Sequence, residues 1–133
     1  MFRLFFLIGL ILVSWFTMDN AVQLFVKNVS DSSIYVFLSY EYPDTTLPVN
    51  KPTKRLFPVE KNQCIAIPLA DTEDELRYDI KSDTLSIFFF DKELYDSLPW
   101  DSIRNNYMIL DRRDIWEETL LDHLSIYYPF QFR

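Results

Sequence analysis

The chain contains a single glycine, Gly9, which lies in an apolar N-terminal run, so the rest of its 133 residues must fold without one. Turns that need a positive φ must therefore use other residues, and Asn and Asp tolerate this conformation best. The candidates are four asparagines near predicted turns: Asn28, Asn62, Asn105 and Asn106. The missing glycines also exclude a Gly-rich phosphate loop, a dinucleotide-binding fingerprint, a nucleophile elbow and an EF-hand loop.

Residues 1–18 have the pattern of an export signal. Arg3 precedes an apolar run at 4–16, which has the length of a signal-peptide core and is short for a membrane span. We therefore divide the chain into a signal peptide or signal anchor at 1–18 and one domain at 19–133. The predicted location is the periplasm or the membrane-anchored cell envelope, with residues 1–18 providing any membrane association.

The end of this leader resembles a bacterial lipoprotein signal. Leu12, Val13 and Ser14 match the three residues that precede the lipid-bearing cysteine of such signals, but Trp15 stands where that cysteine belongs. The match indicates a lipoprotein signal whose anchor residue has been replaced. Whether the leader is cleaved stays open at this point.

Composition indicates a folded, acidic domain. Aromatic residues make up 17% of the chain, which is unlike a disordered segment, and the formal net charge is −7. Such a charge, with Lys51, Lys54 and Arg55 spread among prolines, argues against nucleic-acid binding. A basic protein partner is compatible with it.

Alternating apolar residues predict strands at 22–27, 34–40, 64–69, 84–90, 107–112 and 125–128, the first two paired as a hairpin. Short helices are predicted at 92–98 and 99–104. A third begins at Asp114, with Glu117 completing a capping box and a core stripe formed by Trp116, Leu120 and Leu124. The expected fold is mainly β: an antiparallel β sandwich, or a related sheet, with two or three short helices in the C-terminal half. We expect these core residues: Leu24, Val26, Val36, Leu38, Ile65, Ile67, Leu85, Ile87, Phe89, Ile109 and Leu124.

Residues 41–58 are expected to form a long loop, because prolines at 43, 48, 52 and 58 prevent a paired central strand. An edge strand is predicted at 55–57, followed by a tight turn that uses Asn62. The acidic run at 71–75 fits no known cation-binding loop, so it is interpreted as solvated loop.

Catalytic chemistry has few candidates. Cys64 is the only cysteine and lies in an apolar run, which predicts a buried, inert thiol. His123 is the only histidine and has no second ligand or nucleophile near it in sequence. We therefore assign no catalytic, cofactor-binding or metal-binding residue, and we expect a protein that is not an enzyme.

Three aromatic residues are candidates for contact with a partner. Tyr40 and Tyr42 lie where a strand enters the Pro-rich loop, and Trp100 lies on a predicted short helical turn. Exposed rings at loops give a small β domain a large contact area for a protein or a glycan. The alternative is that these rings seal the ends of the core.

The segments 26–40, 43–44, 87–92, 100–106 and 126–129 resemble a group of small uncharacterised exported proteins of Bacteroides-type bacteria. Members of that group often carry a lipoprotein signal, and the group implies no established activity or site residue.

Three functions are compatible with these patterns. The leading one is a non-enzymatic cell-envelope protein that binds another protein or a glycan. The second is an acidic immunity or inhibitor protein for a basic toxin, because net negative charge favours capture of a basic partner. The third is a hydrolase with an unfamiliar site, which would need converging carboxylates or His123 against one of them.

Overall fold

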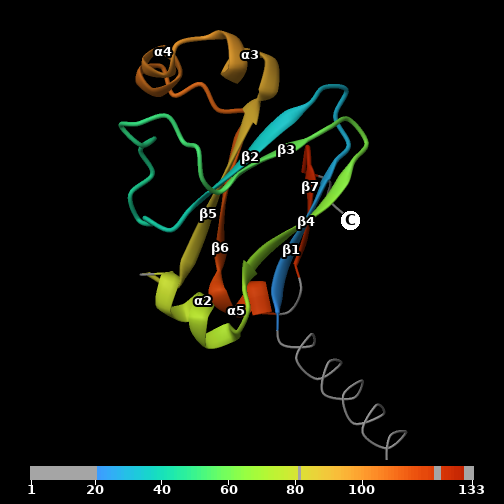
Figure 1. Ribbon diagram of the computed structural model, residues 1–133, viewed down its shortest axis with the longest axis vertical. Helices are drawn as coiled ribbons and strands as arrows, with labels where there is room; N and C mark the ends of the chain where they lie inside the picture. Colours follow the sequence, from blue (N-terminus) through green and yellow to red (C-terminus); the bar gives the residue numbers. More distant parts are fainter. Residues whose placement is uncertain (1–20, 81, 122–123, 131–133) are drawn as a thin grey trace, which may run out of the picture.

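The computed structural model describes residues 21–80, 82–121 and 124–130. Two sheets face each other across a shared core, with short helices at both ends of the molecule (Figure 1). The prediction of a mainly β sandwich with short helices, most of them in the C-terminal half, is confirmed. In the described part of the chain, no helix is long and apolar enough to cross a membrane. Residues 1–18, with Trp15, and His123 lie outside the described residues.

The smaller sheet has the order β4-β1-β7. Its central strand β1 (Val22–Asn28) pairs antiparallel with β4 (Cys64–Ala70) and parallel with β7 (Ser125–Tyr128). The alternation in β1 is complete, because Val22, Leu24 and Val26 are buried while the residues between them are exposed. The sandwich is therefore antiparallel except at the β1–β7 pair.

The larger sheet is antiparallel and has the order β3-β2-β5-β6. Its strands are β3 (Leu56–Val59), β2 (Ile34–Ser39), β5 (Thr84–Asp91) and β6 (Asp111–Trp116). The centre of this sheet is apolar on both faces, since seven consecutive residues of β5 are buried. Both faces must therefore be covered, one by the smaller sheet and the other by a second layer.

The predicted hairpin between the first two strands is wrong. β1 and β2 belong to different sheets, and the turn between them carries the chain from one sheet to the other. The same happens between β3 and β4. Turn residues reveal a change of direction but not whether the next strand stays in the same sheet, so the sequence did not distinguish a hairpin from a crossing.

The main core lies between the two sheets. Of the predicted core residues, eight are fully part of it: Leu24, Val26, Val36, Leu38, Ile67, Leu85, Ile87 and Phe89. Ile65 and Leu124 pack against it with partial exposure. Ile109 instead packs on a second cluster, because it precedes β6 and lies on the other side of the larger sheet.

The helices correct two predictions. The acidic run at 71–75 is not a loop but begins α2 (Glu73–Asp79), where Thr72 caps the helix by accepting a hydrogen bond from the backbone N–H of Glu75 at 3.2 Å. The predicted helix from Asp114 is wrong at its start, because Asp114 lies within β6 and α5 covers only Glu117–Leu121. The strand predicted at 107–112 is accordingly displaced toward the C-terminus.

Two predicted helices are confirmed in the second layer. α3 (Lys92–Ser97) begins at Asp91, whose carboxylate accepts from the backbone N–H of Leu94, and α4 (Trp100–Asn105) follows after Pro99. Figure 1 shows both helices at the end of the larger sheet where β5 ends, and together with Leu47 of the Pro-rich loop they pack on Phe37, Phe88 and Phe90 of that sheet.

Four described residues have a positive φ. Only one of the predicted asparagines is among them, Asn62 at 61°; the others are Arg55 at 57°, Asp83 at 57° and Tyr107 at 49°. Arg and Tyr adopt this conformation at a cost, because their Cβ atoms crowd the backbone. Asn28, Asn105 and Asn106 have other backbone conformations.

Candidate functional site

The Pro-rich loop at 41–55 is fastened to the second layer by four side-chain donors. Trp100 Nε1 donates to the carbonyl oxygen of Pro48 at 3.0 Å, and the hydroxyl of Tyr95 donates to that of Pro52 at 3.0 Å. Arg104 Nε donates to Leu47 at 3.1 Å, and the Tyr107 hydroxyl donates to Thr45 at 3.1 Å. The loop is therefore held in shape although it contains no described strand between 41 and 55.

An apolar cluster lies beneath this loop. Phe37, Phe88 and Phe90 project from the outer face of the larger sheet, and Leu47 of the loop packs with them and with α3 and α4. The ring of Phe90 lies 5.2 Å from that of Tyr95 and 6.1 Å from that of Trp100, measured between centroids. This packing raises the pKa of Tyr95 to about 12, mainly because burial disfavours its ionised form.

Two of the three predicted contact residues are in fact core residues. Trp100 is 8% exposed in the second cluster and Tyr40 is 6% exposed in the main core. Their rings are buried because each completes an apolar cluster at the end of a strand or loop, which is the alternative that the sequence left open. Tyr42 is half-buried and precedes a cis peptide bond to Pro43.

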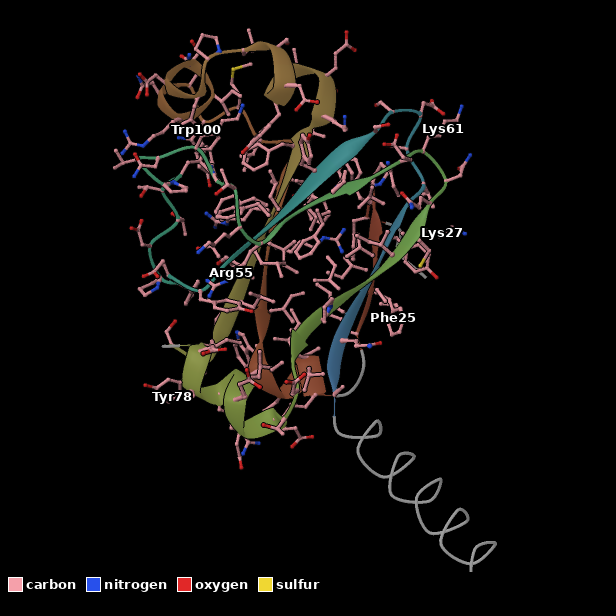
Figure 2. All side chains as sticks on the ribbon, viewed as in Figure 1. Phe25, Lys27, Arg55, Lys61, Tyr78 and Trp100 are labelled. Atoms are coloured by element: carbon pink, nitrogen blue, oxygen red, sulfur yellow. The ribbon has the colours of Figure 1, made fainter. Side chains whose placement is uncertain are left out.

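A hollow of about 460 Å³ opens between the end of β2 and the Pro-rich loop, and we name it the loop groove. Three cationic side chains line it: Lys54 and Arg55 from the loop, and Arg104 from α4. Its apolar surface comes from Phe37, Leu47, Pro48 and Val49. Figure 2 shows Arg55 and Trp100 on the side of the molecule where this loop lies.

The three cations of the loop groove outnumber the two carboxylates in its lining, those of Glu41 and Asp44. Lys54, Arg55 and Arg104 form no ion pair among residues 21–80, 82–121 and 124–130. Four other cations, Arg77, Lys92, Arg112 and Arg113, are each paired with a carboxylate. In a protein of net charge −7, three unpaired cations in one hollow form a local basic site.

Arg55 is held over the ring of Tyr40, with its guanidinium carbon 3.9 Å from the ring centroid. Burial raises the pKa of Tyr40, and the positive charge of Arg55 opposes that shift. The cation–π contact holds the guanidinium group of Arg55 in the wall of the loop groove.

Two acidic residues also line the loop groove, Glu41 and Asp44. The carboxylate of Asp44 accepts hydrogen bonds from the backbone N–H of Thr46 at 2.9 Å and from its hydroxyl at 2.7 Å. These bonds lower the pKa of Asp44, because they stabilise its charged form. The Asp44 carboxylate thus stabilises the conformation of the loop through its bonds to Thr46.

A second notable surface surrounds Trp116, which the sequence placed in a core stripe. This residue is 70% exposed because it ends β6 with its side chain directed away from the core. It borders a hollow of about 590 Å³ that also contains Asp83, Glu117 and Glu118. Arg77 in α2 pairs with Glu117 there, and the neighbouring Tyr78 is 88% exposed.

Cys64 does not meet the prediction of a buried thiol, because it is exposed. It begins the edge strand β4, whose alternation turns Cys64, Ala66 and Pro68 away from the core. Among the described residues there is no group of three or more His, Cys, Asp and Glu side chains that could hold a metal ion.

No protein-family model, curated protein or solved structure matches this chain. The resemblance to a group of exported proteins therefore stays a prediction. The class that the structure defines is a two-sheet β sandwich with a loop and two short helices covering one outer face.

The sequence indicated the place of the candidate site but not its residues. Proline density predicted the long loop, but Lys51, Lys54 and Arg55 are spread among the prolines and were not predicted to form a site. Arg104 could not be linked to them, because it lies 49 positions after Arg55 and only the packing of α4 on the loop brings it there.

Proposed function

We propose that this protein is a non-enzymatic protein of the cell envelope whose loop groove binds an acidic segment of another protein. The observation that carries the proposal is the gathering of Lys54, Arg55 and Arg104, without ion pairs, in one hollow of an acidic protein. The export pattern of the leader supports the envelope location.

The chemistry of the groove favours a carboxylate ligand. A guanidinium group can bind a carboxylate through two parallel hydrogen bonds, and an ammonium group adds a flexible positive charge. The apolar surface of Leu47, Pro48 and Val49 beside these cations suits a peptide that carries aliphatic side chains as well as acidic ones. Four hydrogen bonds to carbonyl oxygens of the loop already hold it in shape. Less conformational entropy of the loop is therefore lost when a partner binds.

A glycan is less well supported than a peptide. Sugar rings are commonly held on exposed aromatic faces, but Phe37 and Tyr40, the rings that line the loop groove, are buried. The face of Tyr40 is in addition covered by Arg55.

The experiment is an amide chemical-shift titration of the isotope-labelled protein with a blocked pentapeptide that contains one Glu next to one Leu. We expect the largest shifts at the backbone amides of Ser39, Thr46 and Lys54, which surround the groove, and none near Trp116. Absence of shifts at millimolar peptide, or shifts confined to other surfaces, would contradict the proposal.

The surface around Trp116 favours a second candidate function, an acidic immunity or inhibitor protein. A tryptophan that is 70% exposed beside Asp83, Glu117 and Glu118 offers a ring face and negative charge to a cationic partner. The same titration with a blocked oligo-arginine peptide separates the two, because this candidate requires shifts at the Trp116 indole N–H. It fails if oligo-arginine leaves that signal unchanged.

A further inference from the structure

A second hollow lies beside the loop groove. It has a volume of about 420 Å³ and shares Thr46, Leu47 and Arg104 with the loop groove. Its remaining lining includes Tyr107 and Arg112, so we name it the arginine hollow. The two hollows thus adjoin along one short stretch of the Pro-rich loop, and Arg104 belongs to both.

The arginine hollow is suited to an anion. Two guanidinium groups, those of Arg104 and Arg112, line it, and none of its lining residues carries a carboxylate. Arg112 donates to the Tyr107 hydroxyl at 3.3 Å and forms an ion pair of 3.5 Å with Asp114, so a ligand carboxylate would share this guanidinium group with Asp114. Arg104 uses only its Nε in the bond to Leu47, so its terminal N–H groups are available to a ligand.

Two of the four described residues with a positive φ line these two hollows, while Asn62 and Asp83 lie elsewhere. Arg55 lines the loop groove with a φ of 57°, and Tyr107 lines the arginine hollow with a φ of 49°. Both conformations are disfavoured for residues that carry a Cβ atom. The surroundings enforce both: the carbonyl of Arg55 accepts from the N–H of Leu38 at 2.9 Å, and the Tyr107 hydroxyl bonds to Thr45.

Strain of this kind clusters at functional sites, where a side chain is needed in a position that an unstrained backbone would not give it. Here the strained residues are an arginine that faces the loop groove and a tyrosine that contacts Arg112. The strain is therefore associated with both hollows together and not with the loop groove alone.

We infer that the ligand is a peptide segment with two carboxylates, one bound by Lys54 and Arg55 and the other by Arg112, with Arg104 between them. This inference rests on the proposed function and names the chemistry of its partner. Two acids on one chain bind more tightly than either alone, because binding of the first brings the second close to its site.

The test compares three blocked peptides of equal length, one with two Glu residues and two in which one or the other Glu is replaced by Gln. Calorimetry with the full chain should give the two-Glu peptide an affinity at least 10-fold above that of either single-Glu peptide. Several spacings between the two acids are compared, since an extended chain advances about 3.3 Å per residue.

Single substitutions test which side chain of the protein binds which carboxylate of the peptide. Arg112→Gln should remove the 10-fold advantage of the second Glu while leaving unchanged the peptide that keeps only the Glu bound by Lys54 and Arg55, and Arg112→Lys should keep part of the advantage. Arg104→Gln should lower the affinity for every peptide that binds the wild-type protein. Arg77→Gln, an exposed arginine in α2 at the other end of the molecule, is the matched control and should change nothing.

The outcomes separate the two proposals. If single-Glu peptides bind in the loop groove and a second Glu adds nothing at any spacing, this inference is overturned and the proposed function stands. If no acidic peptide binds, both are overturned. Tighter binding of oligogalacturonate than of the two-Glu peptide would overturn the peptide identity in favour of an acidic glycan.

Discussion

The side-chain amide of Asn28 donates a hydrogen bond to the carbonyl oxygen of Val59 at 3.1 Å and so joins the two connections that cross between the sheets. The same amide donates to the carbonyl of Ser32 at 2.7 Å, and the Asn28 side-chain oxygen accepts from the N–H of Ser30 at 3.0 Å. Asn28 is fully buried. One polar side chain therefore satisfies three backbone groups where the sheets meet.

Replacing Asn28 tests this arrangement. Asn28→Asp removes both N–H donors and leaves a charge in a buried site, so we expect a loss of about 2–3 kcal/mol in the free energy of unfolding. Asn50→Asp, at an exposed position of the Pro-rich loop, is the control and should change it by less than about 0.5 kcal/mol. Urea unfolding at pH 7 measures both, and equal stability of the two variants would contradict the role of Asn28.

The turn at Asn62 gives a second prediction. Its φ of 61° is accessible to Gly without cost, but Ala must pay about 1 kcal/mol. Asn62→Ala should therefore unfold at lower urea than wild type, and Asn62→Gly should stay within about 0.5 kcal/mol of it. Equal effects of the two substitutions would show that the side chain of Asn62, not its backbone conformation, matters.

The two described tryptophans should respond in opposite ways to substitution. Trp100→Ala empties part of the second cluster and removes the bond to Pro48, so we expect a loss of about 3–5 kcal/mol. Trp116→Ala removes an exposed ring and should cost less than about 0.5 kcal/mol. Thermal unfolding of the two variants side by side provides the measurement. A stable Trp100→Ala protein would mean that this ring is not part of the core.

Alkaline pH should destabilise the fold through its buried tyrosines. The pKa of Tyr95 is raised to about 12 from 10.0, so between these values the unfolded chain releases a proton that the folded chain keeps. Stability is complete below pH 10 and falls as the pH rises toward 12, by at most about 3 kcal/mol for this residue. The pKa values of Tyr40 and Tyr128 are raised as well, so these two residues also contribute to the loss of stability at alkaline pH.

Tyr95→Phe isolates the contribution of this hydroxyl. The variant loses the hydrogen bond to Pro52 and should be about 1 kcal/mol less stable at pH 7. Its stability should then fall less steeply than that of wild type between pH 10 and 12. Tyr78→Phe, at a residue that is 88% exposed, serves as the control. Parallel pH profiles for wild type and Tyr95→Phe would show that Tyr95 does not titrate with folding.

Local patterns in the sequence predicted local structure well. Alternation in β1 and the apolar run of β5 gave both strands within one residue of their observed ends, because side-chain burial follows directly from the period of a strand. The pairing of the strands was harder to predict. Nothing in residues 28–33 distinguishes a hairpin from a crossing, and nothing in β7 indicates that it lies parallel to β1.

Competing local signals explain the remaining errors. Asp114 and Glu117 have the spacing of a capping box, but the pairing of Ser86 with Asp114 in the sheet, with a side-chain hydrogen bond of 2.7 Å, keeps this segment in a strand. Conversely, the charges at 71–75 favour a solvated loop, but Thr72 and Glu75 form the N-terminal cap of a helix there. At the candidate site, the sequence could not predict that Arg104 lies beside Lys54 and Arg55, because only the tertiary fold brings them together.

Calorimetry of a charge-reversal pair tests the central claim most directly, which is that the basic loop groove binds an acidic segment. Lys54→Glu/Arg55→Glu reverses two cations of the groove, and Lys27→Glu/Lys61→Glu reverses two lysines on the opposite side of the molecule in Figure 2. Both variants change the net charge equally. We predict that the first lowers the affinity for a two-Glu peptide at least 10-fold and that the second changes it less than 2-fold. Equal losses in the two variants would show that overall charge, not the loop groove, governs binding.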